Sequence, residues 1–209
     1  MNNIFCRKNR RGQGVSYILL LSLLLLSFTA CSEDDSATDE YANWQERNEA
    51  FINQYATAGS LRKIRAYTQD DTTTGKSGDY IYVKVLETGT GTESPLYTDT
   101  VRVAYRGRII PTTSYPDGAV FDETYINDFS WQTAGMADFV AGEMITGFST
   151  ALMNMHKGDR WQVIIPYQLG YGTTSTNAII GYSTLIFDIA LLDYWHPGDT
   201  RPTFRARQR

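Results

Sequence analysis

The alternation of apolar and polar side chains beyond residue 80 constrains the fold most. Four segments alternate in this way, as strands do when they bury one face. Their apolar positions are Ile81, Val83 and Val85; Val101, Val103 and Tyr105; Trp161, Val163 and Ile165; and Leu185, Phe187, Ile189 and Leu191. Glycine, proline and aspartate separate the segments, which is typical of turns between antiparallel strands. We therefore expect one antiparallel sheet over 80–195.

A single helix interrupts the strands at 146–156. Its apolar residues share one face, and Gly158 is placed to end it as a C-terminal cap. These residues are Phe148, Ala151, Leu152 and Met155. The sequence thus predicts an α+β fold in which a curved antiparallel sheet wraps around one short helix.

A second helix is expected earlier, at 40–58. Asp39 is placed to cap its start and Gly59 to end it. The apolar positions, at roughly helical spacing, are Tyr41, Trp44, Phe51, Ile52 and Tyr55. This apolar face is compatible with packing on the domain in cis and equally with pairing in a homodimer. A polar, glycine-containing linker follows at 68–79.

The first 30 residues have the pattern of an export signal. Four basic residues between positions 7 and 11 precede an apolar run at 17–30, which stops at Cys31. Because a membrane span needs roughly 20 apolar residues, a signal peptide is favoured over an anchor helix. The residues FTAC at 28–31 resemble a bacterial lipobox. The resemblance implies cleavage before Cys31, lipidation of its thiol, for example with palmitate, and attachment to a membrane. The alternative is an ordinary signal peptide followed by a chance cysteine.

The four residues after Cys31 are SEDD at 32–35. They resemble the acidic signal with which Bacteroidetes lipoproteins reach the outer face of the outer membrane, so the expected location is the cell envelope. A solvated acidic tether is the alternative, because runs of like charge stay extended.

Cysteine and charge exclude several classes of function. Cys6 lies in the removable segment and Cys31 would carry lipid, so a disulfide framework, a thiolate metal site and a cysteine nucleophile are excluded. Cleavage before Cys31 leaves 15 basic and 23 acidic residues, a net charge of −8. That balance argues against a nucleic-acid partner. The sequence offers neither a Ser-His-Asp set nor a cluster of metal ligands, so we expect no metal and no cofactor.

Six motifs occur in a fixed order between 101 and 188. They are VRVAYRG at 101–107, DGAVFD at 117–122, MITGFSTALMNM at 144–155, GDRWQVIIP at 158–166, LGYG at 169–172 and TLIFD at 184–188. In this order they resemble the FKBP-type peptidyl-prolyl cis-trans isomerases, over about 80–195. The resemblance implies an enzyme that isomerises X–Pro bonds in exported or envelope proteins.

The resemblance also implies which residues act. A catalytic set would surround the prolyl bond, with Ile145 donating its backbone N–H to a substrate carbonyl and Tyr171 its hydroxyl to a neighbouring one. This set is Tyr105, Phe121, Asp122, Ile145 and Tyr171. A second set would bind the substrate, with Phe148 as the floor where the family usually has tryptophan. This set is Met144, Phe148, Ile179, Phe187 and Phe139. The family's pocket is altered here by a longer connection at 111–116 and by a loop without proline at 173–183.

Other interpretations remain open. The aromatic residues could be plain core residues, and Tyr171 could be only a turn residue. The same fold could serve as a non-catalytic peptide-binding or chaperone module. A glycan-binding or structural surface lipoprotein is a third alternative. The expected divisions are a signal peptide at 1–30, an acidic tether at 31–40, a helix and linker at 41–79, the FKBP-like domain at 80–195 and a basic flexible tail at 196–209.

Overall fold

The computed structural model describes residues 40–200 except 60, 71 and 73. The expected signal peptide, the lipidated Cys31 and the acidic residues 32–35 lie outside the described residues, as does most of the basic tail. Within the described part, no helix is long and apolar enough to cross a membrane.

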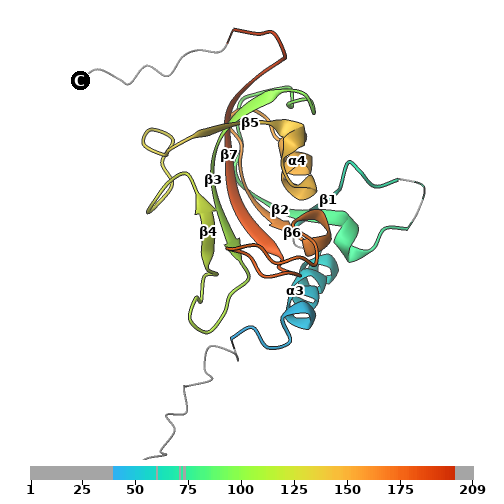
Figure 1. Cartoon of the computed structure of the whole chain (residues 1–209). Coiled ribbons are helices and arrows are strands. Elements are labelled where there is room, and N and C mark those ends of the chain that lie inside the picture. Colours follow the sequence, from blue (N-terminus) through green and yellow to red (C-terminus); the bar gives the residue numbers. More distant parts are fainter. Residues whose placement is uncertain (1–39, 60, 71, 73, 201–209) are drawn as a thin grey trace, which may run out of the picture. The chain divides into compact units, whose positions relative to one another are not determined.

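Seven antiparallel strands form one sheet, in the order β1-β2-β6-β7-β3-β4, with β5 also paired to β3. The strands are β1 (Arg62–Arg65), β2 (Tyr80–Glu87), β3 (Thr100–Ile109), β4 (Val120–Glu123), β5 (Ala137–Val140), β6 (Arg160–Ile165) and β7 (Leu185–Trp195). Among residues 40–200 there are also two α-helices, α3 (Trp44–Ala58) and α4 (Thr146–Leu152). Three short 3-10 helices lie in the same range, η1 (Ser77–Asp79), η2 (Ala141–Glu143) and η3 (Tyr167–Leu169). Figure 1 shows β3 and β7 curving around α4. The predicted α+β fold, with its curved sheet, short helix and N-terminal helix, is confirmed.

The main core lies between α4 and the concave face of the sheet. The pair β3 and β7 forms the longest ladder, from Thr100 opposite Trp195 to Ile109 opposite Leu185. Val103, Leu152 and Ile189 are fully buried there. Burial of such side chains stabilises a fold by roughly 1.5–3 kcal/mol each. The alternation therefore predicted the concave face of β3 and β7 correctly.

Helix α4 is shorter than predicted, because it ends at Leu152 and not at His156. The buried carboxylate of Asp159 accepts hydrogen bonds from the backbone N–H groups of His156 and Gly89. These bonds turn the chain before a further helical turn can form. Gly158 then has a φ of 91°, which a glycine adopts without strain.

Strand β2 buries both of its faces, against the expectation that only one would be covered. Ile81 faces α4, but Tyr82 on the opposite face is only 1% exposed because it packs with Ile52 of α3 and Ile164 of β6. Val85 is exposed, although the alternation predicted it to be buried. The register between β2 and β6 shifts between Val85 and Glu87, so the strand leaves the core there.

Helix α3 packs on its own domain. Of the two alternatives that the sequence left open for this helix, packing in cis and pairing in a homodimer, the structure shows the first. It begins at Trp44 after Asn43, which adopts a left-handed conformation, so the chain does not enter the helix from the expected cap at Asp39. Gly59 ends it with a φ of 61°, as predicted. The strand β1, which pairs with β2, was not expected from the sequence.

The end of β7 is attached to the loop before β3. Asp99 is fully buried, and its carboxylate accepts the Leu96 N–H at 2.8 Å and contacts His196 Nδ1 at 2.8 Å. The hydrogen bond with Asp99 and the charge of its carboxylate raise the pKa of His196. The first residue of the expected tail is therefore held against the domain.

Candidate functional site

Five aromatic rings from five elements meet on the concave side of the sheet. We call them the aromatic cluster: Tyr105 of β3, Phe121 of β4, Phe139 of β5, Phe148 of α4 and Phe187 of β7. The ring centroids of Phe148 and Phe187 are 5.1 Å apart, and those of Tyr105 and Phe148 are 5.9 Å apart. Both pairs meet edge to face, which is a favoured geometry for aromatic rings. The sequence predicted all five residues, and the structure brings them together.

Gly107 explains how two of these rings come so close to the β3 backbone. It pairs with Asp122 of β4 and with Phe187 of β7. A Cβ atom at this position would lie 2.5 Å from Cζ of Phe121 and 2.7 Å from Cε1 of Phe187. Only glycine leaves room for both rings there, so the Tyr-x-Gly sequence of β3 has a direct steric reason.

Tyr105 and Asp122 form the central polar contact of the site. The Tyr105 hydroxyl donates to Oδ2 of Asp122 at 2.6 Å. Tyr105 is 7% exposed, whereas Asp122 is exposed, so the contact joins the aromatic cluster to solvent. Burial raises the pKa of the Tyr105 phenol, and the hydrogen bond to Asp122 raises it further. Tyr105 therefore keeps its proton at neutral pH and remains a donor.

Tyr171 is the more exposed of the two predicted catalytic tyrosines. It is 44% exposed and follows η3 in the turn between Gly170 and Gly172, of which Gly172 has a φ of 67°. Partial burial raises the pKa of Tyr171, and the negative charge of Asp122 adds to the rise. The Tyr171 phenol therefore remains a hydrogen-bond donor at neutral pH.

The start of α4 supplies the remaining backbone group. The Ile145 carbonyl accepts the Ser149 N–H at 3.0 Å and thus begins the helix. Among the described residues, no backbone acceptor is recorded for the Ile145 N–H. Phe148, in the first turn of the helix, is 1% exposed, whereas Met144 and Ile145 are half-buried against the core.

Ile179, which was expected to bind the substrate, is a buried core residue. It is 5% exposed and packs in the main core, on the loop between β6 and β7. The sequence reasoning missed two neighbours of this loop, Trp44 and Asn48 of α3, which hydrogen-bond to Ser183 and Thr184. The helical spacing of apolar residues at 40–58 includes Trp44, but it indicates neither the burial of Asn48 nor the contacts of either residue with the loop.

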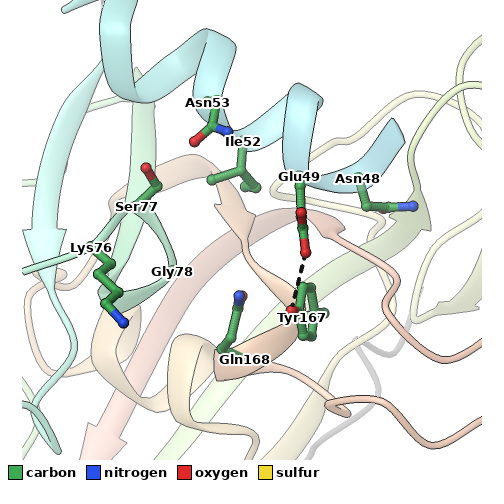
Figure 2. Close-up of a pocket in the computed structure, with 9 residues that line it drawn as sticks. All are labelled: Asn48, Glu49, Ile52, Asn53, Lys76, Ser77, Gly78, Tyr167 and Gln168. Atoms are coloured by element: carbon green, nitrogen blue, oxygen red, sulfur yellow. Dashed lines mark hydrogen bonds between the residues drawn. The ribbon is translucent and has the colours of Figure 1, made fainter. Parts of the chain in front are cut away.

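A separate cavity of about 200 Å³ lies between α3, η1 and η3. Its lining includes Glu49, Lys76 and Gln168, and Figure 2 shows Glu49 turned toward Tyr167, whose hydroxyl is 3.4 Å from Oε1 of Glu49. None of the predicted site residues lines it. Across the part of the chain that the structure describes, no three His, Cys, Asp or Glu residues are grouped so as to hold a metal ion.

The chain is similar to known proteins along most of its length. The sequence model of the FKBP-type peptidyl-prolyl cis-trans isomerases matches residues 91–192. A macrophage infectivity potentiator of Trypanosoma cruzi is 31% identical over 184 residues, which are 87% of this chain and 84% of that protein. An outer membrane protein MIP of Legionella longbeachae is 39% identical over 111 residues, but this chain covers only 42% of it. The crystal structure of FkpA from Escherichia coli superposes with a TM-score of 0.52 at 25% identity, covering 90% of this chain and 75% of that one.

Proposed function

Because this chain belongs to the family of FKBP-type peptidyl-prolyl cis-trans isomerases and is an enzyme of that class, we propose that the aromatic cluster is its active site. The observation that supports this site best is the hydrogen bond between Tyr105 and Asp122 beside five converging rings. The half-buried Phe121 and the exposed Tyr171 leave the cluster accessible from the side of Asp122.

The chemistry of this site follows from the amide bond. Rotation about an X–Pro bond faces a barrier of ~18–20 kcal/mol, because twisting removes the amide resonance. The twisted amide has a less polar carbonyl, so aromatic surroundings without water favour it over the planar form. Phe148 would lie beneath the proline ring, with Phe121 and Phe187 at its sides. The Ile145 N–H and the Tyr171 hydroxyl would bind substrate carbonyls, and bonds that tighten in the twisted state raise the rate.

The substrates that we propose are proline-containing polypeptides of the cell envelope. The support is the match to relatives named as an outer membrane protein and as an infectivity potentiator, together with the export signal of the sequence. A folding polypeptide presents its prolines in extended, solvent-exposed segments, which suits a site open on one side.

An isomerase assay tests the proposed function. The purified chain is expected to accelerate cis-to-trans isomerisation of an X–Pro peptide above the spontaneous rate. A macrolide that binds this family should inhibit it by occupying the aromatic cluster. A rate equal to background, with suppression of client aggregation that survives Phe121→Ala, would instead identify a non-catalytic chaperone module.

We also propose that the chain is a lipoprotein anchored through Cys31 to the outer membrane, with its domain on the outer face. The basic and apolar leader and the sequence FTAC at 28–31 support the anchor, and the acidic residues at 32–35 support the outer face. Cys31→Ser is expected to abolish incorporation of labelled palmitate and to release the chain from the membrane fraction. Continued membrane association of the unlabelled variant would contradict the anchor. Protease treatment of intact cells distinguishes the two faces.

A further inference from the structure

We propose that segment 40–58 positions the two loops beside the aromatic cluster, and that Asn48 and Trp44 are the positioning residues. The inference rests on the proposed function, because it assigns these residues a role at that site. The two loops are 110–119, between β3 and β4, and 173–184, between η3 and β7. They include the stretches in which the sequence departs from the family.

Asn48 joins α3 to the last residue of loop 173–184. Its side chain is fully buried, its Oδ1 accepts the backbone N–H of Thr184 at 2.7 Å, and its Nδ2 donates to the Trp44 carbonyl at 2.7 Å. Thr184 is itself fully buried and immediately precedes β7, which carries Phe187. A buried N–H without an acceptor is costly, so this contact determines where the loop ends.

Trp44 makes the second contact to the same loop. Its indole N–H donates to the Ser183 hydroxyl at 2.9 Å, and that hydroxyl donates to the Ile180 carbonyl at 2.6 Å. The indole ring is 6% exposed and packs in the core that also contains Ile179. Loop 173–184 is thus held by α3 at two consecutive residues, Ser183 and Thr184.

The residues before and within α3 contact the other loop. Oε1 of Glu40 accepts the Ser114 N–H at 2.8 Å, and Nη2 of Arg47 lies 3.4 Å from the Pro111 carbonyl. Hydrogen bonds from Thr112 and Ser114 lower the pKa of Glu40. Since these two hydrogen bonds are exposed to solvent, they are weaker than the buried ones of Asn48.

The consequence for the enzyme is a change in binding and not in chemistry. If the loops are released, only a fraction of the molecules has the arrangement that accepts substrate, and apparent affinity falls by that fraction. Once substrate has bound, the reacting residues are in place. We therefore expect a higher KM at unchanged kcat. A variant that is merely less stable loses folded enzyme, which lowers the apparent kcat at unchanged KM.

Asn48→Ala and Trp44→Phe test the inference in the full chain. Trp44→Phe removes one N–H and keeps an aromatic ring, so it tests the contact even if Asn48→Ala folds poorly. Each variant is expected to raise KM for an X–Pro peptide by about threefold to tenfold. Hydrogen exchange of the backbone amides in 173–184 should quicken to a similar extent. Gln45→Ala is the matched control, because Gln45 lies on the same helix and its side chain donates a hydrogen bond to Glu49 at the surface.

Two outcomes would overturn the inference. One is a KM and a loop exchange rate equal to those of Gln45→Ala in both variants. The other is a loss of kcat alone, which indicates a purely structural helix. An inactive wild-type chain would refute the proposed function. Hydrogen exchange does not depend on activity, so it would still test whether α3 holds loop 173–184.

Discussion

Replacing Asp122 by alanine is expected to lower kcat/KM for prolyl isomerisation by about ten- to a hundredfold. The Tyr105 hydroxyl donates to this carboxylate, and a hydrogen bond to a charged group contributes about 1.5–3 kcal/mol. Without the acceptor, the buried Tyr105 hydroxyl is left unpaired, and the ring loses the polar contact that fixes its orientation beside Phe148. The measurement is the isomerase rate on an X–Pro peptide, with circular dichroism to show that the fold is intact.

Glu123→Gln is the matched control for Asp122→Ala. Glu123 is the next residue of β4, and its carboxylate pairs with Arg106 on the other side of the strand. The substitution therefore removes a neighbouring charge without altering the aromatic cluster, and we expect activity close to that of the wild type. Equal losses in both variants would show that only the overall charge of β4 matters.

Tyr105→Phe tests the same hydrogen bond from its other end. The ring stays, and only the donor is lost. Because both substitutions remove one contact, the double variant is expected to lose little more than either single one. Losses that simply add would mean that the Tyr105 hydroxyl and the Asp122 carboxylate act separately, which would contradict the proposed arrangement.

The burial of Tyr105, Phe148 and Phe187 could be predicted from the sequence, because they lie at alternating positions of strands or on the apolar face of a helix. Phe121 and Phe139, in contrast, were expected from the family resemblance alone. Tyr105 and Phe187 each point to the same face as the valines and isoleucines around them. The close approach of Phe121 and Phe187 to the β3 backbone requires a glycine, which the sequence has at position 107. Local pattern and tertiary contact agree for these core positions, and the grouping of all five rings followed from the order of the six motifs.

The remaining features depend on contacts that no local pattern shows. Tyr82 is buried only because α3 covers it, and α4 stops early only because Asp159 binds the backbone beyond it. The role of Asn48 depends on Thr184, which is 136 residues away in the sequence. An asparagine in a helix is ordinarily read as a surface residue, so its burial could be found only from the assembled fold.

Phe148→Ala is expected to lower the free energy of unfolding by about 3–5 kcal/mol and to abolish activity. The ring is 1% exposed and contacts both Tyr105 and Phe187, so its removal leaves a cavity beneath the proposed position of the proline ring. Chemical denaturation followed by fluorescence measures the loss. Phe129→Ala is the control, since that ring is half-buried on the outer face of the sheet and a smaller loss is expected there.

Phe148→Trp separates stability from catalysis at the same position. The family usually has tryptophan here, but the larger ring must enter a site that Phe148 already fills, and overpacking costs about 1–3 kcal/mol. If the proline ring rests on this side chain, the wider floor should alter the isomerisation rate even where the fold survives. An unchanged rate in a folded Phe148→Trp variant would mean that residue 148 is only a core residue, and the active site would have to be sought nearer Asp122 and Tyr171.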